Sequence, residues 1–201
     1  MSFFENTRKP VGFGGKIMVA MMNFGHSAMA EWGLRFYSLP RMPWCWTAAA
    51  AVERTLNAVE LCPDGKVQGI DYSAVSVEKT RKVNAGAIAA GRCTVQQASV
   101  AELPFEAEQF DVVTAFETVY FWPELAQNFR EVYRVLKPGG IFFICNEANG
   151  ETIKDDKWTQ IIDGMTIYTD TALKEYLEKA GFCQIQSHKN KKGWLCITAQ
   201  K

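Results

Sequence analysis

From residue 66 onward, short runs of apolar residues alternate with longer stretches in which apolar positions follow helical spacing. The short runs predict strands at residues 66–71, 93–98, 110–116, 141–145, 183–188 and 194–199. The longer stretches predict helices at residues 74–90, 123–136 and 170–180. Alternation of this kind is typical of βα units, which form parallel sheets.

The last two predicted strands are joined by only five residues, Lys189 to Gly193. A connection this short joins antiparallel neighbours, because a parallel pair needs a crossover of a dozen or more residues. We therefore expect an α/β fold with a doubly wound, mostly parallel sheet that ends in an antiparallel hairpin. Ahead of this pattern, apolar residues at mixed helical spacing between residues 17 and 39 predict one or two preliminary helices.

The composition favours small partners. Of 201 residues, 48% are hydrophobic, and 22 Lys and Arg balance 22 Asp and Glu, so no net field attracts nucleic acid or an anionic membrane. No run of about 18 apolar residues predicts a membrane span, and the first residues lack the apolar stretch of a secretory signal. Six cysteines without a CxxC pair, beside two histidines, predict reduced thiols of a cytoplasmic protein and no metal site.

Four segments carry a resemblance to a known family. They are NFGHSAMAEWGL (23–34), GKVQGIDYS (65–73), ELPFEAEQFDVVTAFET (102–118) and EVYRVLKPGG (131–140). In this order and spacing they resemble the S-adenosylmethionine (SAM) dependent class I methyltransferases related to the enzymes of ubiquinone and menaquinone biosynthesis. The resemblance implies a Rossmann-like seven-stranded sheet, SAM as the cofactor and a small-molecule methyl acceptor. It also implies one domain, with cap helices at 1–40, a cofactor-binding half at 41–147 and a C-terminal helix and hairpin at 148–201.

The resemblance assigns the nucleoside of SAM to the ends of two strands. Asp71 follows the strand at 66–71, where a carboxylate accepts hydrogen bonds from both ribose hydroxyls. Tyr72 would cover the adenine ring. The alternative is that Asp71 only caps the helix that begins near Ser73.

An acidic residue usually follows the next strand in the family, and here Ser99 stands in that place. Its hydroxyl accepts the hydrogen bond of the adenine amino group without charge assistance, so we expect a weaker contact. Val100 would offer its backbone N–H to the ring. The alternative for both residues is a simple turn before Leu103.

Glu117 ends the strand that, by the resemblance, faces the methionine part of SAM and the acceptor. A carboxylate there would orient the acceptor or take its proton, and the alternative is a charge at a helix start. Tyr120 would lie in the same catalytic pocket with Thr118 and Trp122, although aromatic residues there also suit the core. His26, on a predicted cap helix, is a second candidate base or an ordinary core histidine.

One segment departs from the family. Its first strand normally ends in a glycine-rich loop against the cofactor, but residues 44–52 read WCWTAAAAV without a glycine. Alanine methyl groups there would obstruct SAM, and alanines favour helix. We expect Trp44 to Trp46 to form a short, poorly packed first strand, and Thr47 to cap a helix from Ala48 to Leu61. A reading frame shifted by one base converts a coding run for VLDGCGGG into residues 45–52, which suggests a local frameshift.

The sequence is compatible with two other functions. A methyltransferase-like protein with impaired or absent SAM binding would follow from the lost glycines. A nicotinamide-dependent oxidoreductase also carries an acid after its second strand, but it needs GxGxxG after the first strand. The early glycines at 12–15 precede any predicted strand and do not supply that motif.

Overall fold

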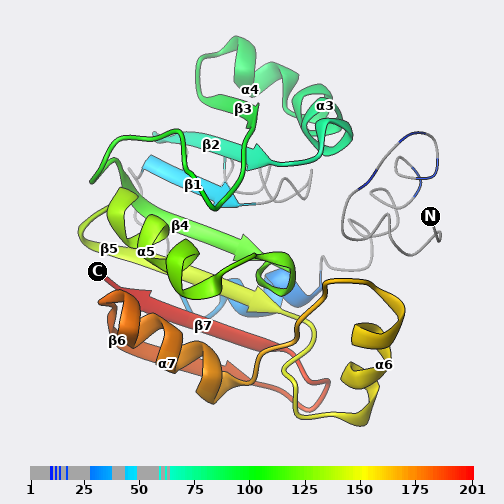
Figure 1. Cartoon of the computed structure of the whole chain (residues 1–201). Helices are drawn as coiled ribbons and strands as arrows, with labels where there is room; N and C mark the ends of the chain where they lie inside the picture. Colours follow the sequence, from blue (N-terminus) through cyan, green and yellow to red (C-terminus); the bar gives the residue numbers. More distant parts are fainter. Residues whose placement is uncertain are drawn as a thin grey trace.

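The computed structural model describes residues 28–37, 44–48 and 64–201, together with positions 10, 12, 14, 17, 59 and 62. Seven strands form one sheet in the order β3-β2-β1-β4-β5-β7-β6 (Figure 1). Their bounds are β1 Trp44–Ala48, β2 Lys66–Asp71, β3 Cys93–Gln97, β4 Phe110–Phe116, β5 Leu136–Asn146, β6 Cys183–Lys189 and β7 Leu195–Gln200. Strands β1 to β5 pair in parallel, whereas β7 pairs antiparallel with both β5 and β6.

Helices cover both faces of this sheet. Helices α5 (Leu125–Val135) and α7 (Asp170–Ala180) lie side by side on one face (Figure 1). The other face carries α3 (Ala74–Val83) with α4 (Ala85–Ala89), and a helical segment at residues 28–34 that packs on β5 and β7. The remaining helices of the described chain are η2 (Val119–Phe121) and α6 (Ile153–Ile161).

Strand β4 shows how the sequence creates two layers. Val113 and Ala115 pack with α5 and α7, whereas Val112 and Phe116 join the clusters on the opposite face. Successive side chains of a strand point to opposite faces, so a strand covered on both sides must be apolar at nearly every position. The run FDVVTAF meets that requirement, which explains why it was readable as a buried strand.

Several predicted boundaries are wrong for local reasons. The single helix expected at 74–90 breaks at Asn84, whose side-chain amide and backbone N–H both bond to the Thr80 carbonyl oxygen. Such local hydrogen bonding by asparagine competes with helix continuation. Strand β5 begins at Leu136 rather than at 141, because Leu136 already pairs with Phe110. Helix α6 lies inside the expected polar connection.

The first strand exists and is longer than predicted. Residues Trp44–Ala48 pair in parallel with β2 on one side and β4 on the other. Thr47 therefore lies inside the strand, opposite Gly69 and Thr114, and does not cap a helix from Ala48. Backbone pairing on two sides overrides the helical preference of alanine at position 48. The packing of the β1 side chains and most of the helix expected up to Leu61 lie outside the described residues.

The sheet presents its carboxyl edge to α6. The parallel strands all end on the right-hand side of Figure 1, where α6 lies beyond the ends of β4 and β5. In open α/β sheets, ligands bind at this edge. Of the predicted division of the chain, most of the 1–40 cap lies outside the described residues, and the three-part division stays a prediction.

Candidate active site

The predicted cofactor residues on β2 lie at the carboxyl edge. Asp71 is the last residue of β2 and is 9% exposed, and its Oδ1 accepts a hydrogen bond from the Ser73 backbone N–H (2.7 Å). Ser73 is the residue that caps α3, since its side chain accepts from Ser76 N–H. Asp71 thus stabilises the turn without being the cap itself, and a carboxylate retains acceptor capacity for further donors. Tyr72, next along, is 37% exposed.

Ser99 forms a turn after β3. Its hydroxyl accepts from the Ala101 N–H (3.2 Å), and its carbonyl accepts from the Glu102 N–H (3.3 Å). The turn expected as the alternative is therefore present. A hydroxyl that accepts one bond still has a proton and a second lone pair, so the turn leaves room for a ligand contact. Val100 is partly buried and packs on the main core.

Glu117 lies at the centre of a hydrogen-bonded cluster at the ends of β4 and β5. Its backbone N–H donates to the Cys145 carbonyl (3.0 Å), and its Oε1 accepts from the Glu147 N–H. The Tyr120 hydroxyl accepts from the Ala148 N–H (2.9 Å) and lies 3.2 Å from both Glu117 Oε1 and the Ala148 carbonyl oxygen. The structure therefore brings together Glu117 and Tyr120, two of the three predicted catalytic residues.

The environment of this cluster changes the acidity of both side chains. Burial, followed by the nearby charge of Glu147, raises the pKa of Glu117 from 4.5 to about 8, despite the opposing hydrogen bonds from Glu147 and Tyr120. Burial and then the charge of Glu117 raise the pKa of Tyr120 well above 10. Burial also raises the pKa of Glu147, and Lys192 partly offsets that rise. Glu117 therefore changes its protonation state near neutral pH, which suits proton transfer.

The other predicted acceptor-side residues differ in their surroundings. Trp122 is 8% exposed and packs on Phe142 and Phe129 with ring centroids 6.0 Å apart, so it belongs to the core. Thr118 is buried, and its hydroxyl has no hydrogen-bond partner among the described residues. His26 lies outside the described residues.

Sequence reasoning missed three residues of this edge. Asn146 ends β5, Glu147 donates its N–H to Glu117, and Ala148 donates its N–H to Tyr120. The prediction ended this strand at 145 and treated the following residues as a connection. Because the carboxyl ends of adjacent parallel strands meet at one edge, the residues directly after the strand at 141–145 could have been found by that rule.

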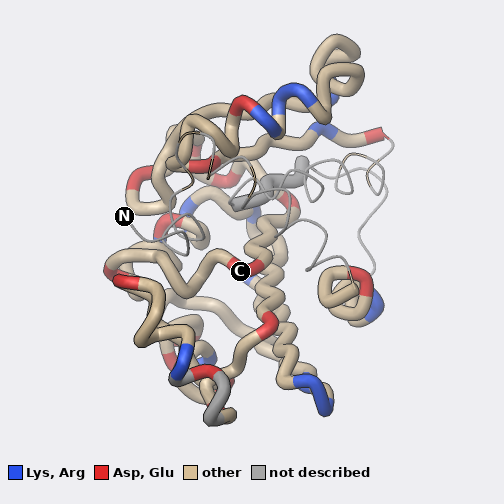
Figure 2. The backbone as a smooth tube through the Cα atoms, turned by 90° about the vertical axis from the view of Figure 1, so that its right-hand side faces the viewer, with Lys and Arg blue, Asp and Glu red and all other residues tan. Residues whose placement is uncertain are grey.

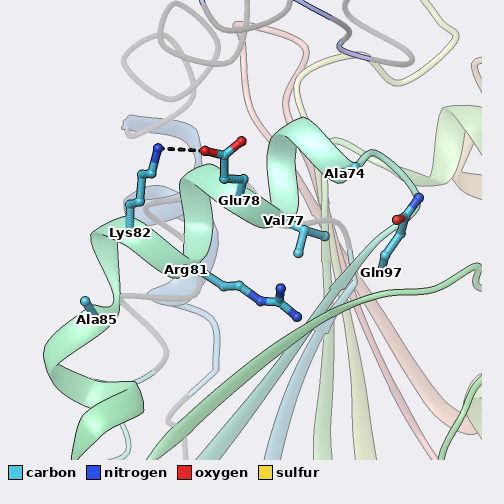
Figure 3. A pocket seen from close by; sticks show the side chains of 7 residues that line it. All are labelled: Ala74, Val77, Glu78, Arg81, Lys82, Ala85 and Gln97. Atoms are coloured by element: carbon cyan, nitrogen blue, oxygen red, sulfur yellow. Dashed lines mark hydrogen bonds and ion pairs between the residues drawn. The ribbon is translucent and has the colours of Figure 1, made fainter.

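A pocket of about 430 Å³ lies along α3 rather than at this cluster (Figure 3). Its lining runs down one stripe of the helix, through Ala74, Val77, Glu78, Arg81, Lys82 and Ala85, and includes Gln97 at the end of β3. Gln97 is the register partner of Asp71, so only the end of the pocket that Gln97 lines approaches the predicted ribose site. The pocket borders the sheet's edge strand, and we assign no cofactor to it.

Comparison with known proteins identifies the fold. Residues 49–144 match the family model of the methyltransferase domain. A demethylmenaquinone methyltransferase from Symbiobacterium thermophilum is 38% identical over 94 residues, which are 47% of this chain and 37% of the relative. The matched part therefore spans well under half of that relative.

Solved structures agree over nearly the whole chain. One similar structure is the Haloferax volcanii complex between the Trm112 methyltransferase activator and the putative methyltransferase. A chain of that complex superposes with a TM-score of 0.77 at 17% identity, and the superposition covers 92% of this chain and 96% of that chain. The protein PigF, solved with SAH, superposes with a TM-score of 0.73 at 15% identity, covering 92% and 60%. At such identities the likeness concerns the fold.

The chain shares the Rossmann-like fold of these solved methyltransferases, and acidic residues lie at the carboxyl edge of its sheet. Over the matched residues the chain is similar to the SAM-dependent methyltransferases of the ubiquinone and menaquinone biosynthesis type. SAM is the cofactor of this family.

The described residues fit this cofactor at its nucleoside end. Asp71 is buried at the end of β2, and β1 separates β2 from β4, so the ends of β2 and β4 are on the order of 10 Å apart. The predicted ribose residue Asp71 and the predicted base Glu117 therefore lie at the ends of two strands with β1 between them. The alanine segment that replaces the glycine loop begins at the end of β1, and residues 49–52 lie outside the described part of the chain.

Proposed function

We propose that this chain transfers a methyl group from SAM to a small-molecule acceptor, with Glu117 as the general base. One observation supports this proposal above the others: a desolvated carboxyl group with a pKa of about 8 is held at the carboxyl edge of β4 by Tyr120 and by the Glu147 N–H. When bound, SAM supplies an electrophilic methyl group. The contribution of the protein is to orient the acceptor and to receive its proton.

Each proposed site residue has a separate task. Asp71 would accept hydrogen bonds from the ribose, Tyr72 would cover the adenine, and Ser99 and Val100 would contact the adenine edge. Glu117 would take the acceptor's proton, and Tyr120 would hold the Glu117 carboxylate in place. His26 remains a proposed second base on the N-terminal cap. The balanced charges of the sequence support a small acceptor rather than nucleic acid or a membrane, and both signs are interspersed along the described backbone (Figure 2).

Two findings bear on where the protein acts. In the described residues, no helix combines the length and apolar character needed to cross a membrane. Among the described residues, Cys93, Cys183 and Cys196 carry free thiols. The free thiols support our proposal of a reducing, cytoplasmic location.

The decisive experiment measures SAM binding and turnover separately. Isothermal calorimetry with SAM and with its demethylated product tests the cofactor site, and release of the demethylated product in the presence of candidate acceptors tests the reaction. We expect binding to both ligands. No heat and no thermal shift at millimolar SAM would support the alternative, a methyltransferase-like protein whose glycine-free segment at 44–52 prevents cofactor binding.

A further inference from the structure

Two buried side chains at the carboxyl edge lack the hydrogen bonds that burial normally requires. Thr118 is 8% exposed and Asn146 is 2% exposed, and neither Thr118 Oγ1 nor Asn146 Oδ1 has a partner among the described residues. Buried polar groups are almost always hydrogen-bonded, because burying an unsatisfied one destabilises the fold. Such an atom in a native protein therefore calls for a specific explanation.

These two residues differ from the other side chains with a buried unpartnered atom. Asn84 and Asn128 donate amide N–H groups to the carbonyl oxygens of Thr80 and Pro123, and Arg92 donates to two carbonyl oxygens. The other carboxylate oxygen of Asp170 accepts from Lys174 and Ser187. Each of those groups thus has a structural anchor. No such anchor is recorded for the Thr118 hydroxyl or the Asn146 amide in the described part of the chain. Neither side chain therefore has a second hydrogen bond, among the described residues, that would compensate for its unpartnered atom.

Thr118 and Asn146 also lie beside the proposed base. Phe116 and Cys145 are register partners in the adjacent parallel strands β4 and β5, so Thr118 and Asn146 follow this pair by two residues and one residue. Glu117, which immediately precedes Thr118, receives the N–H of the residue that immediately follows Asn146. The two residues therefore flank Glu117 in the chain and across the strand pair, at the edge where ligands bind in this type of sheet.

We propose that Thr118 and Asn146 recognise the methyl acceptor by hydrogen bonding, and that the acceptor bears hydroxyl or amine groups. An amide oxygen only accepts hydrogen bonds, and a threonine hydroxyl accepts and donates, so both are matched by O–H or N–H groups of a ligand. A hydrocarbon acceptor would leave both atoms unsatisfied, and sites built for hydrogen bonding reject such ligands strongly. This inference rests on the proposed methyltransferase function.

The first test measures the free protein and needs neither SAM nor an acceptor. Thr118→Val and Asn146→Leu remove the polar atoms while nearly keeping the side-chain shape. We expect each to raise the melting temperature by about 2–4 °C, because an unsatisfied buried group is removed. Thr80→Val is the matched control, since Thr80 is fully buried but donates to the Ser76 carbonyl (2.8 Å), and its substitution should lower the melting temperature. A fall in melting temperature for Thr118→Val and Asn146→Leu would overturn the proposal, because it would show a structural role.

The second test compares acceptor classes in the wild-type protein and the variants. The probes are catechol and histamine, which carry hydroxyl or amine groups, and naphthalene, which carries neither. We expect millimolar catechol or histamine, but not naphthalene, to raise the melting temperature of the SAM-loaded protein. We expect Thr118→Val and Asn146→Leu to raise the Kd of the stabilising probe about tenfold or more. Equal stabilisation by naphthalene, or no weakening in the variants, would contradict the pair's role. The Kd for SAM is measured in both variants as well. An unchanged Kd shows that the cofactor site is intact, so that a change in probe binding belongs to the acceptor site.

Discussion

At the residue scale, Glu117 has properties that ordinary surface carboxylates lack. It adopts a left-handed backbone conformation with φ 57°, its carboxyl group is desolvated, and its Oε1 receives the Glu147 N–H. Each of these features alone is unfavourable or restrictive. Their combination at the carboxyl edge supports our proposal that Glu117 acts as the general base.

The pKa of Glu117 predicts the pH dependence of turnover. A general base must be ionised, and burial has raised this pKa to about 8. We therefore expect kcat to increase with pH and to level off above about pH 8, and Glu117→Gln to lower kcat by about a hundredfold or more. Steady-state rates between pH 6 and 10 test this. Glu106→Gln, at an exposed position, is the control and should leave the profile unchanged.

The same shift predicts how stability depends on pH. Because the folded-state pKa of Glu117 lies above its ordinary value, the stabilisation from the protonated form is complete below about pH 4.5 and is lost as the pH rises to about 8. We expect Glu117→Gln, which stays neutral, to be more stable than wild type at pH 9, by on the order of a few kcal/mol, and to resemble it at pH 5. Urea unfolding at both pH values measures the difference. Equal stabilities at pH 9 would show that the carboxylate is well solvated.

The sequence allowed some of these residues to be predicted but not others. Asp71 and Glu117 lie at the ends of readable apolar runs, so the family resemblance could be aligned to them, and the same resemblance named Tyr120 three residues after Glu117. Asn146 and Glu147 were missed because the residues after the strand at 141–145 were treated as a connection, whereas the pairing of β4 with β5 brings them beside Glu117. Trp122 was predicted to face the acceptor but packs on Phe142 in the core. The sequence alone does not distinguish an aromatic side chain that packs in the core from one that contacts a ligand.

At the element scale, two of the segments that carried the family resemblance contact each other. Arg134 on α5 donates to the carbonyl oxygens of Phe105 (2.8 Å) and Leu103 (3.2 Å) and pairs with Glu131, which in turn accepts from the Leu103 N–H (3.2 Å). This contact lowers the pKa of Glu131, chiefly through the hydrogen bond from Arg134. The motifs at 102–118 and 131–140 thus hold the loop between β3 and β4 against α5.

Loss of this contact should destabilise the fold. We expect Arg134→Met to lower the free energy of unfolding by about 1–2 kcal/mol, since four hydrogen bonds from a partly exposed guanidinium are removed. Arg130→Met, on the same helix at an exposed position, should change it by less than about 0.5 kcal/mol. Chemical denaturation compares the two. Equal effects would mean that the loop is held by its apolar contacts alone.

The helical segment at 28–34 depends on the absence of a side chain at Gly33. A Cβ added there would lie 2.5 Å from Cys145 Sγ and 3.3 Å from the Phe143 ring. We therefore expect Gly33→Ala to destabilise the protein by about 1–3 kcal/mol through overpacking. Gly86→Ala, where a Cβ meets nothing within 4 Å, should stabilise α4 by about 0.5–1 kcal/mol. Thermal unfolding of both variants tests whether the segment packs on the sheet as described.

At the scale of the whole molecule, the sheet was more predictable than its cofactor loop. A mostly parallel sheet with a terminal hairpin followed from apolar runs and from one short connection. The first strand was predicted too short because Thr47 was taken as a helix cap and the alanines after it favour helix, whereas pairing with β2 and β4 extends the strand to Ala48. The helix α6, with few apolar positions, gave no periodic signal.

The altered segment after β1 yields a prediction for the entire protein. Replacing residues 45–52 by Val-Leu-Asp-Gly-Cys-Gly-Gly-Gly would restore the family's glycine loop in the same register. We expect this variant to bind SAM at least about tenfold more tightly than the chain as it stands, because side chains no longer obstruct the backbone approach. Calorimetry on both proteins measures the ratio. The same Kd in both would show that the alanines are compatible with the cofactor.

The left-handed backbone conformation at position 117 lowers the stability of the protein, while the glutamate there is the residue to which we assign the proton transfer. Glycine adopts that conformation without strain, so Glu117→Gly would relieve both the backbone and the buried carboxyl group. A population of variants selected only for heat resistance should therefore discard this carboxylate early, whereas selection for turnover should retain it. Sequencing the survivors of the two selections would show whether natural selection has maintained this residue for its chemistry.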